Sequence, residues 1–485
     1  MENGKWKMDA SARLPFSILD SRFSRPAVLL VAALSGCTVG PDYETPKASV
    51  PSAWTEAPSN PVDPAALARW WGLFGVPELD RLVARVAADN LDLAAAAARI
   101  REARAQYAVT TGGAWPELGA GAGYERRRRS ENNSFRPREL DQGLYDAGFD
   151  LSWEIDLFGR LTRGREAAAA DIAAAVEDRR DVLLSLQAET ARTYFALRGL
   201  QRRLAGARDA VRTLEETVEL TRSRFAAGLT SELDVVRAQS LLERTRAQVP
   251  ALEADLRRAG YRLAVLAGLP PGALDAELDT DKALATEPPL IAAGTPSELL
   301  RRRPDIRRAE RELAAATARI GVATSDLYPR ITLSADLGLQ SENFADLFAK
   351  SSHAWLIAPS VSWPIFRGGT IRANIRLQEA RQERALARYR QAVLMSLEEA
   401  ENALTAHARE RERRRSLAAA AESAARAVAL AEELYGNGLT DFLTVLDARR
   451  TLQDAQDLLI QSETQGAVNT VALGKALGGG WETEN

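Results

Sequence analysis

The chain has 485 residues, and its 63 Lys and Arg residues against 66 Asp and Glu residues leave a formal net charge of -3. This balance argues against a nucleic-acid partner. The single cysteine, Cys37, excludes a disulfide bond within the chain. The charges are interspersed along Ala-, Leu- and Arg-rich stretches, which is typical of long solvated helices.

The amino terminus reads as a secretory signal. Arg22 and Arg25 precede the apolar run Ala27–Leu34, which is too short to span a bilayer and ends at Ser35-Gly36-Cys37. We therefore expect residues 1–36 to be a signal peptide. Leu34 to Cys37 looks like a bacterial lipobox, which implies that Cys37 is lipidated; a plain secretory signal is the alternative. Residues 37–64 are rich in Pro, Ser and Thr and read as a lipidated, extended tether.

Four segments alternate apolar and polar residues with a period of two. Each covers roughly ten residues, the length that a tilted strand needs to cross a membrane with one apolar face. An antiparallel sheet with one wet face in a soluble domain is the alternative. Pro359 and Pro364 predict a bulge or a strand end. The predicted strands cover about 117–125, 146–157, 330–340 and 355–366.

Long helical patterns follow each pair of strands. The first predicts a hairpin over about 164–268, whose apolar positions keep the 3-4 spacing of a coiled coil, and the second a hairpin over about 370–477. Pro250 should kink the first returning helix. A further helix is expected from about Pro77 to Thr111. Residues 271–302 read as a linker or equatorial segment, and residues 478–485 as a tail.

The two halves of the chain repeat each other. Trp153 returns as Trp363 and Gly228 returns as Gly438, both 210 positions later, and Trp115-Pro116 returns as Tyr328-Pro329, 213 positions later. The first repeat covers residues 65–270 and the second 303–477. Such duplication predicts a unit that packs against its own copies. It favours a wall or a tube over a pocket enzyme.

The strand count predicts an assembly. Four strands cannot close a barrel, because about eight is the smallest number that does, and lipid cannot satisfy the hydrogen-bonding groups of an open edge. Several chains must therefore combine. Three would supply twelve strands, although two or four are allowed by arithmetic alone.

These features resemble the TolC family, and more narrowly the NodT-type outer-membrane lipoproteins of resistance-nodulation-division (RND) efflux systems. The resemblance is carried by the lipobox followed by Gly40-Pro41-Asp42-Tyr43, by Trp70-Trp71, by the two aromatic-Pro pairs and by the Gly hairpin tips. It implies an α+β membrane protein: a homotrimer with a 12-stranded β-barrel continuous with a long periplasmic α-helical coiled-coil barrel.

The same resemblance implies a function. The protein would be the outer-membrane exit duct of a tripartite efflux pump in a Gram-negative bacterium, anchored in outer-membrane lipid. Its partners would be a periplasmic adaptor protein and an inner-membrane RND-type pump. Two alternatives remain: a type I protein-secretion channel, and a structural coiled-coil lipoprotein without a pore.

No catalytic grouping is apparent. The two histidines, His353 and His407, are far apart in the sequence, and no nucleophile elbow, phosphate-binding Gly loop or metal motif is present. We therefore expect neither an enzyme nor a cofactor or metal ion.

The hairpin tips are the candidate working site. Gly228 and Gly438 permit a sharp reversal. The resemblance implies that the tips meet the adaptor through residues that comprise Arg224, Gly228, Leu229, Thr230, Gly438, Leu439 and Thr440.

The resemblance also places a constriction, or gate, at the tips. Tyr435 and Asp447 match positions that the family uses there, and Asp234 matches an acid that partners the tyrosine. Arg237 is the repeat equivalent of Asp447, so opposite charges could link neighbouring columns. Thr440 and Thr444 depart from the basic and acidic residues of the best-known member, so a double acidic ring is not supported, although Thr444 stays among the gate positions.

Overall fold

The computed structural model describes residues 38–56, 64–132, 141–279 and 291–481. The predicted signal peptide and Cys37, the predicted site of lipidation, lie outside them. The chain divides into two compact units. Of the described residues, the sheet unit comprises 38–40, 113–132, 141–163 and 321–371, and the helical unit comprises the others. Each predicted repeat therefore contributes to both units.

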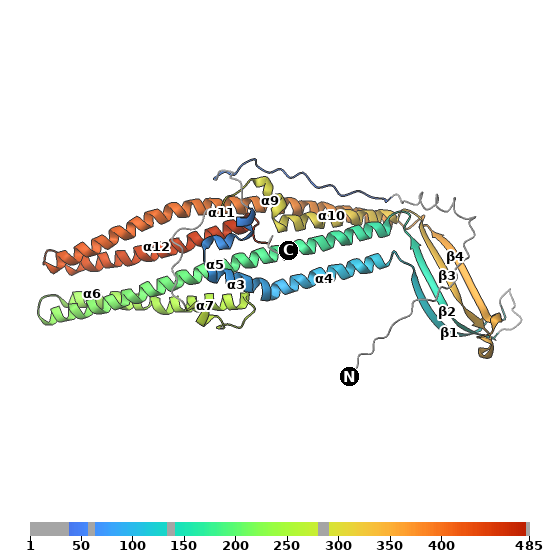
Figure 1. Ribbon diagram of the computed structural model, residues 1–485, viewed down its shortest axis with the longest axis horizontal. Coiled ribbons are helices and arrows are strands. Elements are labelled where there is room, and N and C mark those ends of the chain that lie inside the picture. Colours follow the sequence, from blue (N-terminus) through green and yellow to red (C-terminus); the bar gives the residue numbers. More distant parts are fainter. Residues whose placement is uncertain (1–37, 57–63, 133–140, 280–290, 482–485) are drawn as a thin grey trace, which may run out of the picture. The chain divides into compact units, whose positions relative to one another are not determined.

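The sheet unit is built on four antiparallel strands in the order β1-β2-β3-β4 (Figure 1). Strand β2 begins five residues before the predicted start at 146, and β4 ends before Trp363-Pro364, because proline cannot donate to the ladder. Pro359 lies inside β4, opposite Leu333 of β3, so the bulge or strand end predicted at Pro359 is wrong; within one chain β4 is an edge strand, where proline is tolerated. The strands are β1 Glu117–Arg128, β2 Asp141–Ile155, β3 Arg330–Ser341 and β4 His353–Ser362.

The two faces of the sheet differ in polarity. Leu151 lies opposite Ala335 and Trp153 lies opposite Leu333, so apolar side chains gather on one face as the period of two requires. That face is uncovered: Leu337 is 64% exposed and Trp355 is 74% exposed. An apolar surface of this kind marks contact with a membrane or a partner.

The helical unit contains two long hairpins. Helices α5 and α11 have 67 residues each, roughly 100 Å at 1.5 Å per residue. In Figure 1 the chain returns along α5 as α6 and α7 and along α11 as α12. Within the described residues, no helix is both long enough and apolar enough to cross a membrane. The hairpin helices are α5 Arg160–Ala226, α6 Glu232–Arg246, α7 Gln248–Leu266, α11 Thr370–Gly436 and α12 Phe442–Ala476.

Shorter helices complete this unit. The predicted linker forms two short helices, α8 and α9, in its described parts. The remaining elements are α2 Pro64–Ala68, the 3-10 helix η1 Trp70–Phe74, α3 Pro77–Asp89, α4 Leu91–Gly112, α8 Asp275–Leu278, α9 Pro296–Arg302 and α10 Pro304–Ser325. Two short 3-10 helices, η2 Phe344–Asp346 and η3 Lys350–Ser352, lie between β3 and β4.

Two of the predicted helices are each divided into two. One division follows from a proline that lacks a backbone N–H, and the other from a side chain that caps the next helix. The returning helix divides at Ala247, three residues before Pro250, because Pro250 cannot donate to the preceding turn. The single helix expected from Pro77 to Thr111 also divides, at Asn90, which has extended dihedral angles. Its side-chain oxygen accepts from the N–H of Asp92 and Leu93 at 2.9 and 3.1 Å, so it caps α4.

Equivalent hydrogen bonds recur in the two repeats. The indole of Trp153 donates to the carbonyl of Ala114, and that of Trp363 donates to the carbonyl of Leu327, both at 3.0 Å. The donors are 210 positions apart and the acceptors 213, as in the sequence repeat. At the ends of the returning helices, the Asn90 side chain donates to the carbonyl of Leu266, and the Arg303 side chain donates to the carbonyl of Ala476. Here the donors are 213 positions apart and the acceptors 210.

Segments near both ends of the described chain pack against the helical unit. The segment expected to be a tether is extended but packed: Trp54 is buried and donates to the carbonyl of Gly294 at 2.9 Å. At the other end the Trp481 ring lies 4.5 Å from the guanidinium of Arg180 and 5.1 Å from that of Arg307. The described part of the predicted tail is therefore fixed by cation-π contacts.

Candidate functional site

Both long helices end in the same reversal. Gly228 and Gly438 have φ of 71° and 72°, the left-handed conformation that glycine adopts without strain. The N–H of Leu229 donates to the carbonyl of Arg224 at 2.9 Å, and Leu439 makes the equivalent bond at the second tip, also at 2.9 Å. These bonds form the Schellman motif. The predicted reversal at both glycines is confirmed.

An acid takes part in capping the helix that follows each tip: Asp234 completes a capping box with the N-cap Ser231, whereas Asp441 is itself the N-cap. Asp234 accepts from the hydroxyls of Thr230 and Ser231 at 2.7 and 2.9 Å. Asp441 accepts from the N–H and the hydroxyl of Thr444 at 3.0 and 2.7 Å. The Thr230 hydrogen bond holds the pKa of Asp234 below its usual value, and the Thr444 hydrogen bonds do the same for the pKa of Asp441.

Tyr435 links the two tips through its ring. The guanidinium of Arg224, at the end of α5, lies 4.6 Å from the ring centroid of Tyr435, and the ring of Phe442 lies 5.4 Å away. Asp234 forms its hydrogen bonds with Thr230 and Ser231 of its own turn. Within the described part of one chain it therefore does not bind Tyr435. A pairing of these two residues between copies stays a prediction.

Arg449, which the sequence did not single out, joins the hairpins below the tips. It lies on α12, contacts Glu432 of α11 at 2.6 Å and donates to the hydroxyl of Thr217 on α5 at 3.1 Å. It lies beside an apolar cluster that packs the hairpins together. The buried members are Leu214, Val218, Ala238, Leu242, Ala431, Phe442, Val445 and Leu446. The sequence carries no signal for this contact, because Thr217 is 232 positions away.

Asp447 and Arg237 are both exposed. Within the described residues, these two side chains do not form an ion pair with each other. Arg237 instead adds to the lowering of the Asp441 pKa, after the hydrogen bonds from Thr444. Asp447 is therefore presented on the exposed surface of α12.

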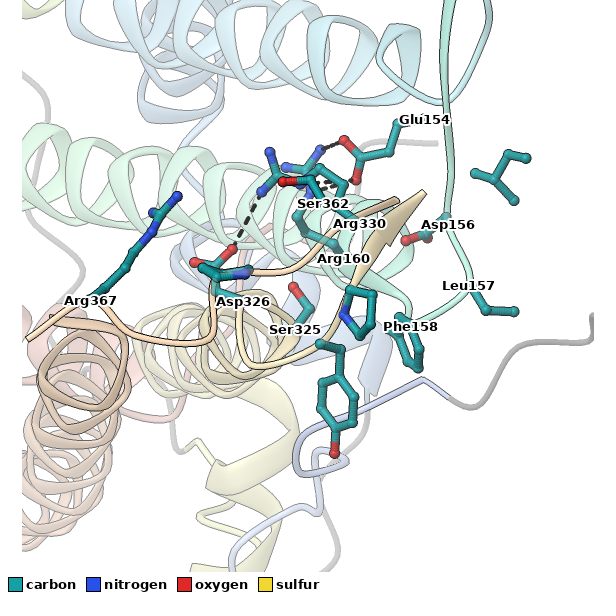
Figure 2. A pocket seen from close by; sticks show the side chains of 14 residues that line it. Glu154, Asp156, Leu157, Phe158, Arg160, Ser325, Asp326, Arg330, Ser362 and Arg367 are labelled. Atoms are coloured by element: carbon teal, nitrogen blue, oxygen red, sulfur yellow. Dashed lines mark hydrogen bonds and ion pairs between the residues drawn. The ribbon is translucent and has the colours of Figure 1, made fainter. Parts of the chain in front are cut away.

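The end of the sheet holds a second concentration of charge. A pocket of about 150 Å³ lies where β2 and β4 end and β3 begins (Figure 2). Arg160 donates to both carboxylate oxygens of Glu154 at 2.8 and 2.6 Å. Arg330 lies 4.0 Å from Glu154 and 3.4 Å from Asp326. Figure 2 shows these side chains turned toward one another. Because the charges neutralise one another in place, the arrangement stabilises the junction between strands and offers no catalytic group.

Among the residues that the structure describes, no three His, Cys, Asp or Glu side chains lie together in a way that could hold a metal ion.

Comparison with known proteins gives a consistent result. Residues 82–269 and 295–479 match the family model described as outer membrane efflux protein. The chain is 34% identical to the pyoverdine export outer membrane protein OpmQ of Pseudomonas putida, over 94% of this chain and 97% of that protein. It is 35% identical to the outer membrane protein OprJ of Pseudomonas aeruginosa, over 95% and 96%.

Solved structures agree with these relatives. The outer-membrane channel OprN has 38% sequence identity and a TM-score of 0.86, over 92% of this chain and 100% of that one. The open state of the MtrE outer membrane channel of Neisseria gonorrhoeae has 30% identity and a TM-score of 0.83, over 92% and 99%. The predicted α+β channel fold is confirmed.

Proposed function

The chain belongs to the outer membrane efflux protein family, and from this membership we propose that three copies form the passive exit duct of a tripartite pump. The protein is an efflux channel of the outer membrane, as its relatives are. In the proposed assembly, an inner-membrane pump of the RND type supplies small molecules and a periplasmic adaptor meets the hairpin tips. The family comprises channels rather than enzymes.

The observation that carries the proposal is the open sheet. Strands β1 and β4 each have one unpaired edge, and the apolar face of the sheet is uncovered. An edge in lipid leaves backbone groups without partners, so each edge must pair with another strand. Pairing β4 of one copy with β1 of the next satisfies both edges, and three copies give a closed set of twelve strands.

The internal duplication predicts the register of this seam. Strand β4 is the repeat equivalent of β2, 210 positions later, and β1 is the equivalent of β3, 213 positions earlier. The β4–β1 seam should therefore copy the β2–β3 pairing. The pair Leu151 and Ala335 translates to Val361 of one copy opposite Ala122 of the next.

Cysteine cross-linking checks this register. A chain with Val361→Cys and Ala122→Cys should form covalent dimers and trimers on mild oxidation, because paired strands bring Cβ atoms to about 4.5–5.5 Å. A matched control combines Val361→Cys with Ala120→Cys, a slip of two residues on the same face. The readout is the band pattern on a denaturing gel. Equal cross-linking of the two combinations would contradict the register, and the absence of cross-linked species from both would contradict the shared sheet.

We further propose that the tips form the gate, with Asp447, Tyr435, Asp234, Thr444 and Arg237 at the constriction. Three exposed Asp447 carboxylates near a common axis would attract cations and bind divalent ions. Support comes from the exposure of Asp447 and from the packing of the two tips through Tyr435 and Arg224. Lipidation of Cys37 and adaptor contact at the tips stay predictions.

Asp447→Asn should weaken cation selectivity and the block by divalent ions, because it removes three negative charges from one ring without changing side-chain size. Single-channel currents in planar bilayers measure both properties. Asp454→Asn, on the same helix, is the matched control. If the two variants select ions alike, the constriction does not lie at Asp447.

A further inference from the structure

One face of β1 changes character in three steps toward the β1–β2 loop. Apolar side chains come first, an aromatic ring second and arginines last. These alternate residues share one face of the sheet, in the order Leu118, Ala120, Ala122, Tyr124, Arg126 and Arg128. The sequence of layers is that of one membrane leaflet, from acyl chains through the interface to the phosphate groups.

Neighbouring strands continue the aromatic layer. The Tyr124 ring lies 4.5 Å from that of Tyr145 on β2, and Tyr145 lies 5.5 Å from Phe344, which follows β3. Gly143 makes room for this arrangement, since a Cβ on Gly143 would lie 3.1 Å from the Tyr124 hydroxyl. An aromatic band of this kind marks the membrane–water interface in transmembrane strands.

The two arginines, here called the rim arginines, are exposed cations with weak partners. Arg126 is 68% exposed and donates to the two carboxylate oxygens of Asp141 at 3.1 and 2.9 Å, and Arg128 is 72% exposed and lies 3.6 Å from Glu131. Exposed ion pairs of this kind contribute at most about 1 kcal/mol. A phosphate group can accept the same two parallel hydrogen bonds from a guanidinium and carries more negative charge than a carboxylate. A phosphate group can therefore compete with both carboxylates.

We propose that Arg126 and Arg128 bind the phosphate groups of the phosphorylated glycolipid in the outer leaflet of the outer membrane. The proposal rests on the proposed function for its orientation. All four strands lead into helices at one end of the sheet, whereas the β1–β2 and β3–β4 loops share the other end. If the helices face the pump, the rim arginines face the cell exterior, where this glycolipid supplies the leaflet.

Native mass spectrometry of the full-length protein in detergent micelles tests the proposal. The probes are diphosphorylated lipid A and the same lipid after enzymatic removal of its phosphates. The wild type should bind the phosphorylated form about tenfold more tightly, and Arg126→Gln with Arg128→Gln should remove that preference. The matched control is Arg127→Gln with Arg129→Gln, because Arg127 belongs to the opposite face and Arg129 lies beyond the strand.

The control should keep the preference within about twofold, whereas Asp141→Asn should strengthen it by freeing Arg126. If both double variants lost the preference for the phosphorylated lipid to the same extent, the preference would depend only on net charge, and the proposal would be overturned. Equal binding of the two lipids, or displacement of the lipid by millimolar inorganic phosphate, would also overturn it. The same spectra report the number of copies, so a trimer that lacks lipid preference contradicts only this inference.

Discussion

Tyr435→Ala combined with Arg449→Ala is expected to raise the open fraction of the channel about tenfold. The first substitution removes the ring beneath Arg224, a contact of roughly 0.5–1 kcal/mol at an exposed site. The second removes the hydrogen bond to Thr217, about 0.5–1.5 kcal/mol net. Both contacts join the second hairpin to the first. Losing them shifts the balance between closed and open tips by about 1–2.5 kcal/mol, a range that includes the roughly 1.4 kcal/mol of a tenfold change.

Single-channel recording in planar bilayers measures the open fraction directly. Tyr435→Phe keeps the ring and should behave like the wild type if the cation-π contact is the relevant one. Arg450→Ala removes a neighbouring, more exposed arginine whose distance to Asp454 is 3.9 Å, so it controls for loss of charge on α12. If the double variant opens no more often than Arg450→Ala, these contacts do not restrain the gate.

Much of the architecture was predictable because it depends on local patterns. The period of two along the strands, the glycines at both tips and Pro250 in the returning helix each act through the backbone of their own neighbourhood. The duplication of Trp153 as Trp363 gave the order of elements in the second half. The structure repeats the associated hydrogen bonds at the same offsets.

Other features required knowledge of distant contacts. Asn90 reads as one polar residue in a helical stretch, yet it ends α3 because its side chain both caps α4 and donates to the carbonyl of Leu266. Arg449 gains its role from Thr217, which is 232 positions away. The docking of Trp481 depends on two arginines from different helices. Charged residues are so frequent on long helices that sequence alone does not distinguish such positions.

A buried ion pair in the helical unit is another feature that the sequence did not reveal. Glu78, in the first turn of α3, and Arg198 of α5 form an ion pair with side chains only 1% and 2% exposed. Tyr194 donates to Glu78 at 2.9 Å, and Arg198 donates to the carbonyl of Leu278 on α8 at 3.2 Å. Burial raises the pKa of Tyr194 to about 12. The network joins α3, α5 and α8 within the largest apolar core.

Glu78→Ala is expected to destabilise the helical unit by about 3–5 kcal/mol, because it leaves the Arg198 guanidinium buried without its counter-charge. The measurement is thermal unfolding of the detergent-solubilised protein, followed by helical circular dichroism. Arg85→Ala is a matched control, since Arg85 of α3 pairs with Glu277 of α8 at 3.0 Å but both side chains are partly exposed. Its expected cost is below about 1 kcal/mol.

A second variant separates the charge from the packing. Glu78→Leu combined with Arg198→Met replaces both partners with apolar side chains, and such replacements are often neutral or stabilising. It should therefore recover much of the stability that Glu78→Ala loses. If Glu78→Ala unfolds with the same midpoint as Arg85→Ala, water reaches the pair and the network does not hold α3 in place. If the apolar pair is as unstable as Glu78→Ala, the loss comes from altered packing rather than from the unpaired charge.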